Sequence, residues 1–150
     1  MKKRIALVVG SAGLLVLLVA GVAFAMAITG TNGPNNITAT NRADNIAASA
    51  NRDIVNGSGG PDRIFGDGGN DALDGGAGSD HIEGGDGDNV ARGSDGNGDW
   101  VSVVDNDTND FVSGGNGTDD VCVVDLIDGE SDDYSDTCEE VYQTESMPQQ

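Results

Sequence analysis

A nine-residue period runs through the middle of the chain and constrains its fold more than any other feature. Read in blocks of nine from Gly30, seven consecutive blocks keep their phase without a gap. The sixth residue of each block is Asp or Asn, and the eighth is aliphatic. Such self-similarity is typical of solenoids, in which each repeat buries its apolar side chain only against neighbouring repeats. The chain is therefore expected to stack coils rather than to enclose a globular core.

Within one block, the residues predict a turn followed by a very short strand. The first and fourth positions are mostly glycine, which permits the left-handed backbone of tight turns. The last three positions place one apolar side chain between two outward ones, which is the alternation of a strand. A strand this short needs parallel partners from the coils above and below it. After the seventh block the phase slips, and further rungs are expected at 99–101, 110–112 and 119–121.

The charge of the chain restricts its partners. There are 7 Lys and Arg against 26 Asp and Glu, which gives a net charge of −19. With so few Lys and Arg residues, the chain has no basic surface that could bind the phosphate backbone of a nucleic acid. Beyond its basic N-terminal residues, an anionic membrane surface would repel the chain. No serine, cysteine or carboxylate pair has an identifiable base partner. We expect neither a nucleic acid, nor a small-molecule substrate, nor enzymatic activity.

The phased aspartates require a counter-ion. One buried aliphatic side chain per block contributes about 1.5–3 kcal/mol, whereas ordering nine residues costs on the order of 10 kcal/mol. Stacking the coils would also bring like-charged carboxylates into register. Ca²⁺ takes about six to eight oxygen ligands from carboxylates and carbonyls, and Mg²⁺ demands a stricter octahedron. Zinc is disfavoured because His81 is the only histidine. The sequence therefore predicts several Ca²⁺ ions and folding on binding.

Blocks such as GSGGPDRIF at 57–65 and GGAGSDHIE at 75–83 resemble the GGxGxDxUx nonapeptide of the RTX, or hemolysin-type, calcium-binding repeat family. The resemblance is continuous over about residues 30–92 and resumes around 105–122. It implies an all-β fold, a right-handed β-solenoid known as a parallel β-roll, with two nonapeptides per coil. Calcium would lie between each turn and the turn two repeats later.

Transferred to this sequence, the resemblance implies two columns of metal ligands. The first column would pair Asp44 with Asp62 and Asp62 with Asp80, and the second would pair Asp53 with Asp71 and Asp71 with Asn89. The implied side-chain ligands are Asp44, Asp53, Asp62, Asp71, Asp80, Asn89 and, in the last copy, Asp119. The implied carbonyl ligands are those of Gly57, Gly59, Gly66, Gly68, Gly75 and Ala77.

Two blocks, 39–47 and 48–56, depart from the family pattern because alanine stands at their first position. We expect them to bind weakly or to act as a capping coil. The strongest sites are expected from residues 57–83.

The first 27 residues are expected to form an export signal or a membrane anchor. A basic start precedes an uncharged apolar run over 5–28, and the residues 23–25 and 25–27 fit a small-residue cleavage pattern. As a helix, the run would measure about 36 Å, enough to cross a hydrocarbon core of about 30 Å. Two alternatives stay open. Either the segment is cleaved and the protein is secreted, or it stays as a helix on the outer face of the cytoplasmic membrane.

The remaining chain is expected to divide into three parts. These are the β-roll at 28–122, with its best repeats at 57–92 and an irregular stretch at 93–113; a C-terminal cap at 123–142; and a disordered tail at 143–150. In an exported chain, Cys122 and Cys138 are expected to form a disulfide. Cys122 is expected to point outward from the last rung, so that the bridge ties the cap over the open end of the solenoid.

Together these features predict an exported calcium-binding protein without catalytic activity, whose protein or cell-surface partner is not indicated. An alternative is an extracellular adhesive or ice-binding module. It is motivated by Thr31-Asn32 and Thr40-Asn41, which lie nine residues apart and are followed by Ser49 and Ser58.

Overall fold

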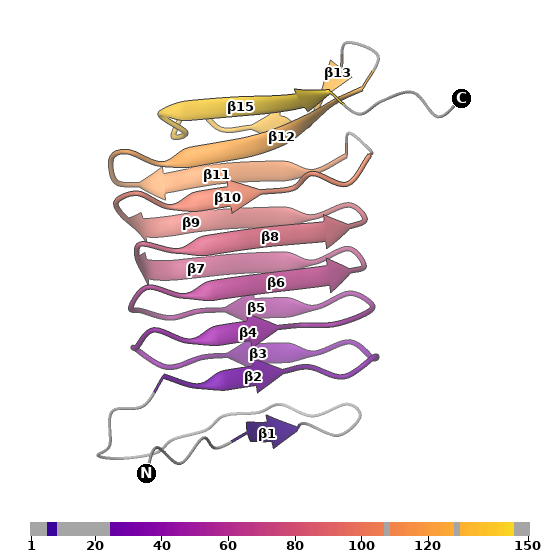
Figure 1. The fold of residues 1–150 in the computed structure, drawn as a ribbon, viewed down its shortest axis with the longest axis vertical. Coiled ribbons are helices and arrows are strands. Elements are labelled where there is room, and N and C mark those ends of the chain that lie inside the picture. The colour runs from indigo at the N-terminus through magenta and orange to yellow at the C-terminus, as the bar shows by residue number, and fades with distance from the viewer. Residues whose placement is uncertain (1–5, 9–24, 107–108, 128–129, 146–150) are drawn as a thin grey trace.

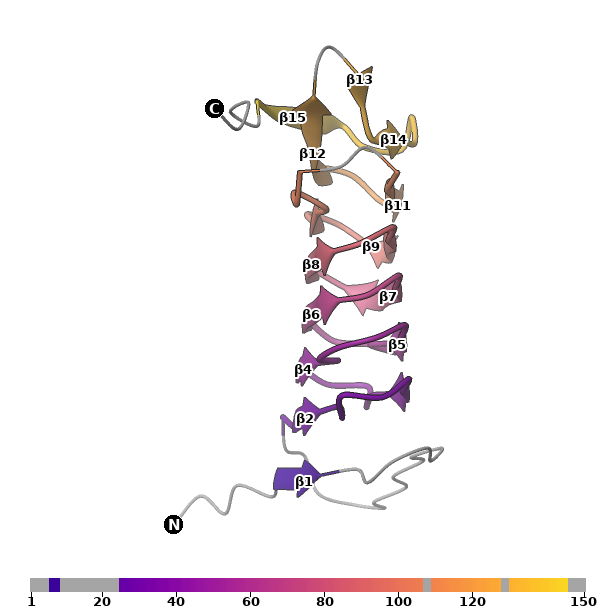
Figure 2. The same ribbon diagram turned by 90° about the vertical axis from the view of Figure 1, so that its right-hand side faces the viewer.

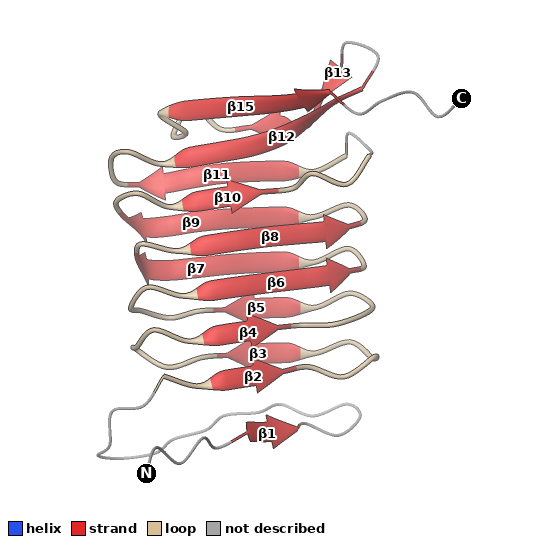
Figure 3. Ribbon diagram, viewed as in Figure 1, coloured by secondary structure: helices blue, strands red, loops and turns tan. Residues whose placement is uncertain are grey.

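The computed structural model describes residues 6–8, 25–106, 109–127 and 130–145. Its strands are stacked as rungs along the long axis of the molecule, in chain order from one end to the other (Figure 1). Successive rungs belong alternately to two facing sheets, which Figure 2 shows from the side. Every regular element in the described ranges is a strand (Figure 3). The expected all-β, parallel β-solenoid is therefore confirmed.

One sheet has nine strands in the order β1-β2-β4-β6-β8-β10-β12-β13, with β15 also paired to β12. These strands are β1 Ala6–Val8, β2 Ala27–Thr29, β4 Asn45–Ala47, β6 Arg63–Gly68, β8 His81–Asp86, β10 Trp100–Ser102, β12 Val121–Ile127, β13 Glu130–Ser131 and β15 Glu140–Glu145. All of its pairings are parallel except that of β12 with β13.

The other sheet has six strands in the order β14-β11-β9-β7-β5-β3, and all of its pairings are parallel. These strands are β3 Asn36–Thr38, β5 Ile54–Asn56, β7 Ala72–Gly78, β9 Val90–Gly96, β11 Phe111–Asn116 and β14 Asp133–Tyr134.

Each coil contains two nonapeptide blocks. Asn45 pairs with Arg63, and Arg63 pairs with His81, so stacked residues are 18 apart. Toward the C-terminus the equivalent spacing grows to 19 and then to 21 residues, because extra residues are added to the turns. The stretch 93–113 is thus irregular in its turns, while its rungs keep their stacking.

Strand length follows the glycine content of the turns. The strands β2 to β5 have three residues, as expected, but β6 to β9 have six or seven. In these later coils the pairing continues into the turn, for example between Asp67 and Gly85. Glycine has no side chain to hold the stacked backbones apart, so the ladder extends through positions that would otherwise form an open turn.

A single line of apolar side chains from each sheet forms the core. The eighth residue of every block faces inward and is no more than 4% exposed. This line consists of Ile28, Ile37, Ile46, Val55, Ile64, Leu73, Ile82, Ala91, Val101, Val112 and Cys122. Outward neighbours remain in solvent, as Ile54 shows at 49% exposed. The predicted inward position is confirmed up to Val112, but at the last rung Cys122 rather than Val121 faces inward.

The disulfide between Cys122 and Cys138 is confirmed, with a Cα–Cα distance of 5.8 Å, but the expected direction of Cys122 is wrong. Cys122 is fully buried in the core line, and Cys138 packs against that core from the C-terminal side. The block that begins at Gly114 contains one extra residue, so the strand alternation turns Cys122 inward. The bridge therefore closes the end of the solenoid from within.

The C-terminal segment adds a strand to the C-terminal end of each sheet. β14 pairs with β11, and β15 pairs with β12 over six residues, from Glu140 to Glu145. β15 thus extends three residues into the segment expected to be a disordered tail, because the edge of β12 offers backbone partners along that length. Occupied edges reduce the tendency of a sheet to pair with other chains.

The expected N-terminal helix falls mostly outside the described residues. Of that stretch, Ala6–Val8 form β1, which pairs with β2. No helix within the described ranges is long and apolar enough to cross a membrane.

Truncating one inward side chain tests the core line against a matched outward control. We expect Ile64→Ala to lower the free energy of unfolding by about 2–5 kcal/mol, because Ile64 is fully buried. Ile54→Ala removes the same atoms from an exposed position, so its effect should stay within about 0.5 kcal/mol. Urea titrations in calcium would measure both values, and equal effects would contradict the assignment of faces.

Candidate metal centre

Each turn buries its acidic residue where the turn meets the following strand. The buried set is Asp44, Asp53, Asp62, Asp71, Asp80, Asn89, Asp99, Asp110 and Asp120, each no more than 4% exposed. Carboxylates are almost never buried to this degree unless they are paired or hydrogen-bonded. The partners of the two carboxylate oxygens therefore decide what these turns can do.

The first carboxylate oxygen, Oδ1, is satisfied by the backbone of the preceding coil. The N–H of Asp44 donates to Oδ1 of Asp62 at 2.7 Å, and the N–H of Asp62 donates to Oδ1 of Asp80 at 2.8 Å. In the other column, the N–H of Asp53 donates to Oδ1 of Asp71 at 2.8 Å. These bonds join equivalent residues one coil apart, so the acidic residues stack in two columns, in the pairs that the sequence predicted.

The second carboxylate oxygen, Oδ2, has no hydrogen-bond donor among the described residues in six of these turns. The six are Asp53, Asp62, Asp71, Asp80, Asp99 and Asp120. The described part of the chain also shows no arginine in an ion pair with any of them. A buried acceptor without a donor costs about 1–3 kcal/mol, and more when it is charged. Within the described residues, these six carboxylates therefore have no positively charged side chain as a partner.

The space beside these oxygens is lined by further oxygen atoms. A Cβ added to Gly66 would collide both with Oδ2 of Asp71 and with the carbonyl oxygen of Gly84 in the next coil. Gly57 has the same relation to Oδ2 of Asp62 and to the carbonyl oxygen of Gly75. Glycine is needed at positions 57 and 66 because two oxygens converge there on its Cα.

Oxygen-only donors of this kind fit a hard cation such as Ca²⁺. No group of three His, Cys, Asp or Glu side chains that could hold a metal occurs in the described ranges. Backbone carbonyls must therefore complete any shell, as they do in glycine-rich calcium turns. Zinc, which prefers nitrogen and sulfur ligands, does not fit these turns.

Burial also raises the pKa values of five of these carboxyl groups. Desolvation raises the pKa of Asp62 to about 7 and the pKa values of Asp71 and Asp99 to about 6. It also raises the pKa values of Asp53 and Asp80. Hydrogen bonds from the preceding coil oppose this rise without cancelling it. In the absence of a cation, the turns therefore tend to bind protons instead.

Two residues expected among the ligands are satisfied by the chain itself. Oδ2 of Asp44 accepts hydrogen bonds from the N–H of Thr40 at 2.8 Å and from its hydroxyl at 2.7 Å. Asn89 accepts from the N–H of Asp71 at 2.9 Å and donates from Nδ2 to the carbonyl of Gly85 at 2.8 Å. Their turns are closed without an ion.

The register expected for the last rung is wrong by one residue. Asp119 is exposed, with a φ of 67°, whereas Asp120 is buried and accepts from the N–H of Asp99. The extra residue in this turn causes the shift. Asp99 and Asp110 are buried at the end of their turns, in the same way as Asp62. The sequence predicted them as residues of rungs but not as metal ligands. An acidic residue two places before each inward side chain was the signal that could have identified them.

The expected carbonyl ligands lie in the stacked turns, in unequal positions. The carbonyl of Gly75 and Oδ2 of Asp62 both lie beside Cα of Gly57, while the carbonyl of Ala77 accepts a hydrogen bond from the N–H of Gly60 at 2.6 Å. The other four belong to the turns that contain Asp62 and Asp71. They are Gly57, Gly59, Gly66 and Gly68.

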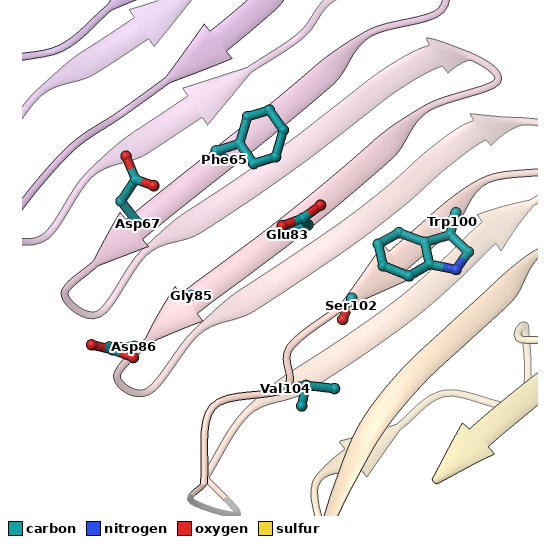
Figure 4. Close-up of a pocket in the computed structure, with 8 residues that line it drawn as sticks. All are labelled: Phe65, Asp67, Glu83, Gly85, Asp86, Trp100, Ser102 and Val104. Carbon is teal, nitrogen blue, oxygen red and sulfur yellow. The ribbon is translucent and has the colours of Figure 1, made fainter. Parts of the chain in front are cut away.

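A shallow groove on the outer face of β6, β8 and β10 is separate from these turns (Figure 4). It is lined by Phe65, Asp67, Glu83, Gly85, Asp86, Trp100, Ser102 and Val104. Next to it, His81 stacks on Trp100 with ring centroids 4.3 Å apart and pairs with Glu83 at 2.9 Å. The three acidic residues of the groove are exposed, so water solvates them. They lack the buried, donor-free oxygens that distinguish the turns.

Alanine scanning of two neighbouring glycines tests the crowding in the turn. We expect Gly66→Ala to lower the free energy of unfolding in calcium by about 1–3 kcal/mol, because the new Cβ displaces Oδ2 of Asp71 and the carbonyl oxygen of Gly84. Gly68→Ala is the matched control, since a Cβ there would meet no atom within 4 Å. It should be neutral, or stabilising by up to about 1 kcal/mol. Equal losses in calorimetric melts would contradict the proposed crowding.

The raised pKa values predict that the calcium-free protein is more stable in acid. A carboxyl group whose pKa rises from 3.8 to about 7, as for Asp62, binds its proton more tightly in the folded state. Its contribution is fully present below about pH 4 and is lost as the pH rises through about 6 to 7. The melting temperature in EDTA should therefore fall between about pH 4 and pH 7.

In saturating calcium this trend should weaken or reverse, because the ion replaces the proton on the ionised groups. Circular dichroism melts across the pH range would measure both series. A melting temperature in EDTA that stays constant or rises toward pH 7 would show that these carboxyl groups are not buried as described.

The family model of the RTX calcium-binding nonapeptide repeat matches the chain in four copies, at residues 29–64, 48–82, 65–98 and 102–122. Neither the curated proteins nor the solved structures compared with the chain give a match. The matched residues make up more than half of the 150 residues and include five of the six aspartates with a donor-free carboxylate oxygen. The sixth, Asp99, lies directly after the third copy. The chain therefore belongs to the RTX calcium-binding nonapeptide repeat family.

Proposed function

We propose that this protein binds several Ca²⁺ ions between its stacked turns and completes its folding when they bind. The observation that carries the proposal is the set of six buried aspartates whose Oδ2 atoms have no donor. A hard cation would supply the missing positive charge, and membership of the RTX family supports calcium as that cation.

The residues of each turn have separate tasks in this proposal. The backbone N–H of Asp44 holds Oδ1 of Asp62, which leaves Oδ2 directed toward the oxygen-lined space. Gly57 has no side chain that would fill that space, and the carbonyl of Gly75 adds an oxygen from the next coil. When bound, calcium would join oxygens of two successive coils and cancel the repulsion between their aspartates. Ion binding and coil stacking would then be a single equilibrium.

We also propose that the protein acts outside the cytoplasm, without enzymatic activity. The disulfide between Cys122 and Cys138 supports an oxidising compartment. Extracellular calcium modules work at about 10⁻⁴–10⁻³ M, so sites of modest affinity would be filled there. Residues 1–27 would provide the export signal, or an anchor if they are retained.

The adhesive or ice-binding alternative receives less support. It needs a row of threonine hydroxyls facing water. The hydroxyl of Thr31 instead donates to Oδ1 of Asn35 at 3.0 Å, and that of Thr40 donates to Asp44. Both hydroxyls belong to the hydrogen bonding of their own turns, so we do not propose an ice-binding surface.

Far-UV circular dichroism during a calcium titration tests the proposed function. We expect the full chain at neutral pH to gain β-structure as Ca²⁺ is added, because the ion removes the charge repulsion between coils. The same concentrations of Mg²⁺ should produce little change, since Mg²⁺ fits carbonyl-rich turns poorly. A spectrum that is equally β-rich in EDTA, or that does not respond to millimolar Ca²⁺, would contradict the proposal.

A further inference from the structure

The first turn of the solenoid, residues 30–35, differs from the turns that need a cation. Its sixth residue is Asn35, and the side-chain amide of Asn35 is surrounded by oxygen atoms. We propose that this amide takes the place of a calcium ion, so that the turns 30–35 and 48–53 are joined without metal. The inference rests on the proposed function, because it states which of the family's positions remain free of calcium.

The contacts of Nδ2 carry the argument. It lies 3.0 Å from the carbonyl oxygen of Thr31 and 2.6 Å from that of Gly33, both in its own turn. It also lies 3.2 Å from the carbonyl oxygen of Ala48 and 2.8 Å from Oδ1 of Asp53, both in the turn one coil later. The nitrogen thus gathers oxygens from two stacked turns, as a bridging cation would. Its two protons can serve two of these acceptors at a time.

The orientation of the Asn35 amide is fixed by its other end. Oδ1 accepts hydrogen bonds from the N–H of Thr31 at 3.1 Å and from the Thr31 hydroxyl at 3.0 Å. Rotating the amide would place its oxygen against three carbonyls and a carboxylate, all of which are acceptors. The network therefore assigns the nitrogen to the oxygen-lined side.

Aspartate at the equivalent position leaves this space without a donor. Asp71 stands two coils later in the same column, and its Oδ2 has no hydrogen-bond partner among the described residues. Asn89 repeats the arrangement of Asn35 in part, since its Nδ2 donates to the carbonyl of Gly85.

In the first coil, Asn35 and Thr40 together satisfy both turns. Terminal repeats of solenoids are commonly atypical because they have a neighbour on one side only. The turn 30–35 is the first of its column, because β3 is the edge strand of its sheet, whereas β4 also pairs with β2. Both turns of residues 30–47 are held by hydrogen bonds rather than by ions.

Changing the amide to a carboxylate tests this directly. We expect calcium-loaded Asn35→Asp to bind one more Ca²⁺ per chain than the unchanged protein, because it supplies the missing oxygen and removes the competing amide. Asn36→Asp is the matched control, since it adds the same charge at the adjacent, exposed position. It should leave the count unchanged. Native mass spectrometry of the full chain would count the ions.

A folded Asn35→Asp protein that binds the same number of ions as the unchanged protein would overturn the inference and leave the proposed function intact. An unchanged protein that binds no calcium would instead overturn both, because no cation would exist for the amide to replace.

The reverse substitution keeps the inference testable if Asn35→Asp does not fold. Asp71→Asn should fold in calcium and bind at least one ion fewer, because the new amide would close its turn as Asn35 does. An unchanged count, or loss of the β-rich spectrum in calcium, would contradict the inference.

Discussion

The whole solenoid depends on how a carboxylate is buried between two stacked turns. One oxygen of each acidic side chain accepts an N–H from the previous coil, which fixes the distance and register of the coils. In six turns the other oxygen has no donor among the described residues. A buried charged acceptor of this kind is destabilising until a cation joins it. The same residue therefore specifies how the coils stack and, in the proposed function, makes that stacking dependent on Ca²⁺.

The thin core makes this dependence strong. Each block buries a single apolar side chain, so hydrophobic burial alone holds neighbouring coils weakly. Glycine at the first position lets two coils approach closely enough for a carbonyl and a carboxylate to share one space. The end coils are stabilised by different means. The first uses the Asn35 amide and Thr40, while the last uses the buried disulfide and the added strands β14 and β15.

The period was sufficient to predict the rungs, the inward residues such as Ile64, and the two columns of aspartates. It was not sufficient where a turn gains a residue. An insertion reverses the strand alternation, so Asp120 rather than Asp119 is buried and Cys122 faces the core. The role of the Asn35 amide could not be predicted from the sequence either, because it depends on carbonyl oxygens that come together only when the coils stack. The sequence pattern therefore predicts the turns, whereas the hydrogen bonds distinguish the turns with a donor-free carboxylate oxygen from those whose side chains the chain itself satisfies.

A crystal structure grown in calcium, with anomalous scattering data, would test the central claim most directly. The account predicts calcium peaks within about 2.3–2.6 Å of Oδ2 of Asp62 and Asp71 and none beside Nδ2 of Asn35. Calcium found only on exposed carboxylates such as Asp67 and Asp86, with the buried Oδ2 atoms free of any ion, would contradict it.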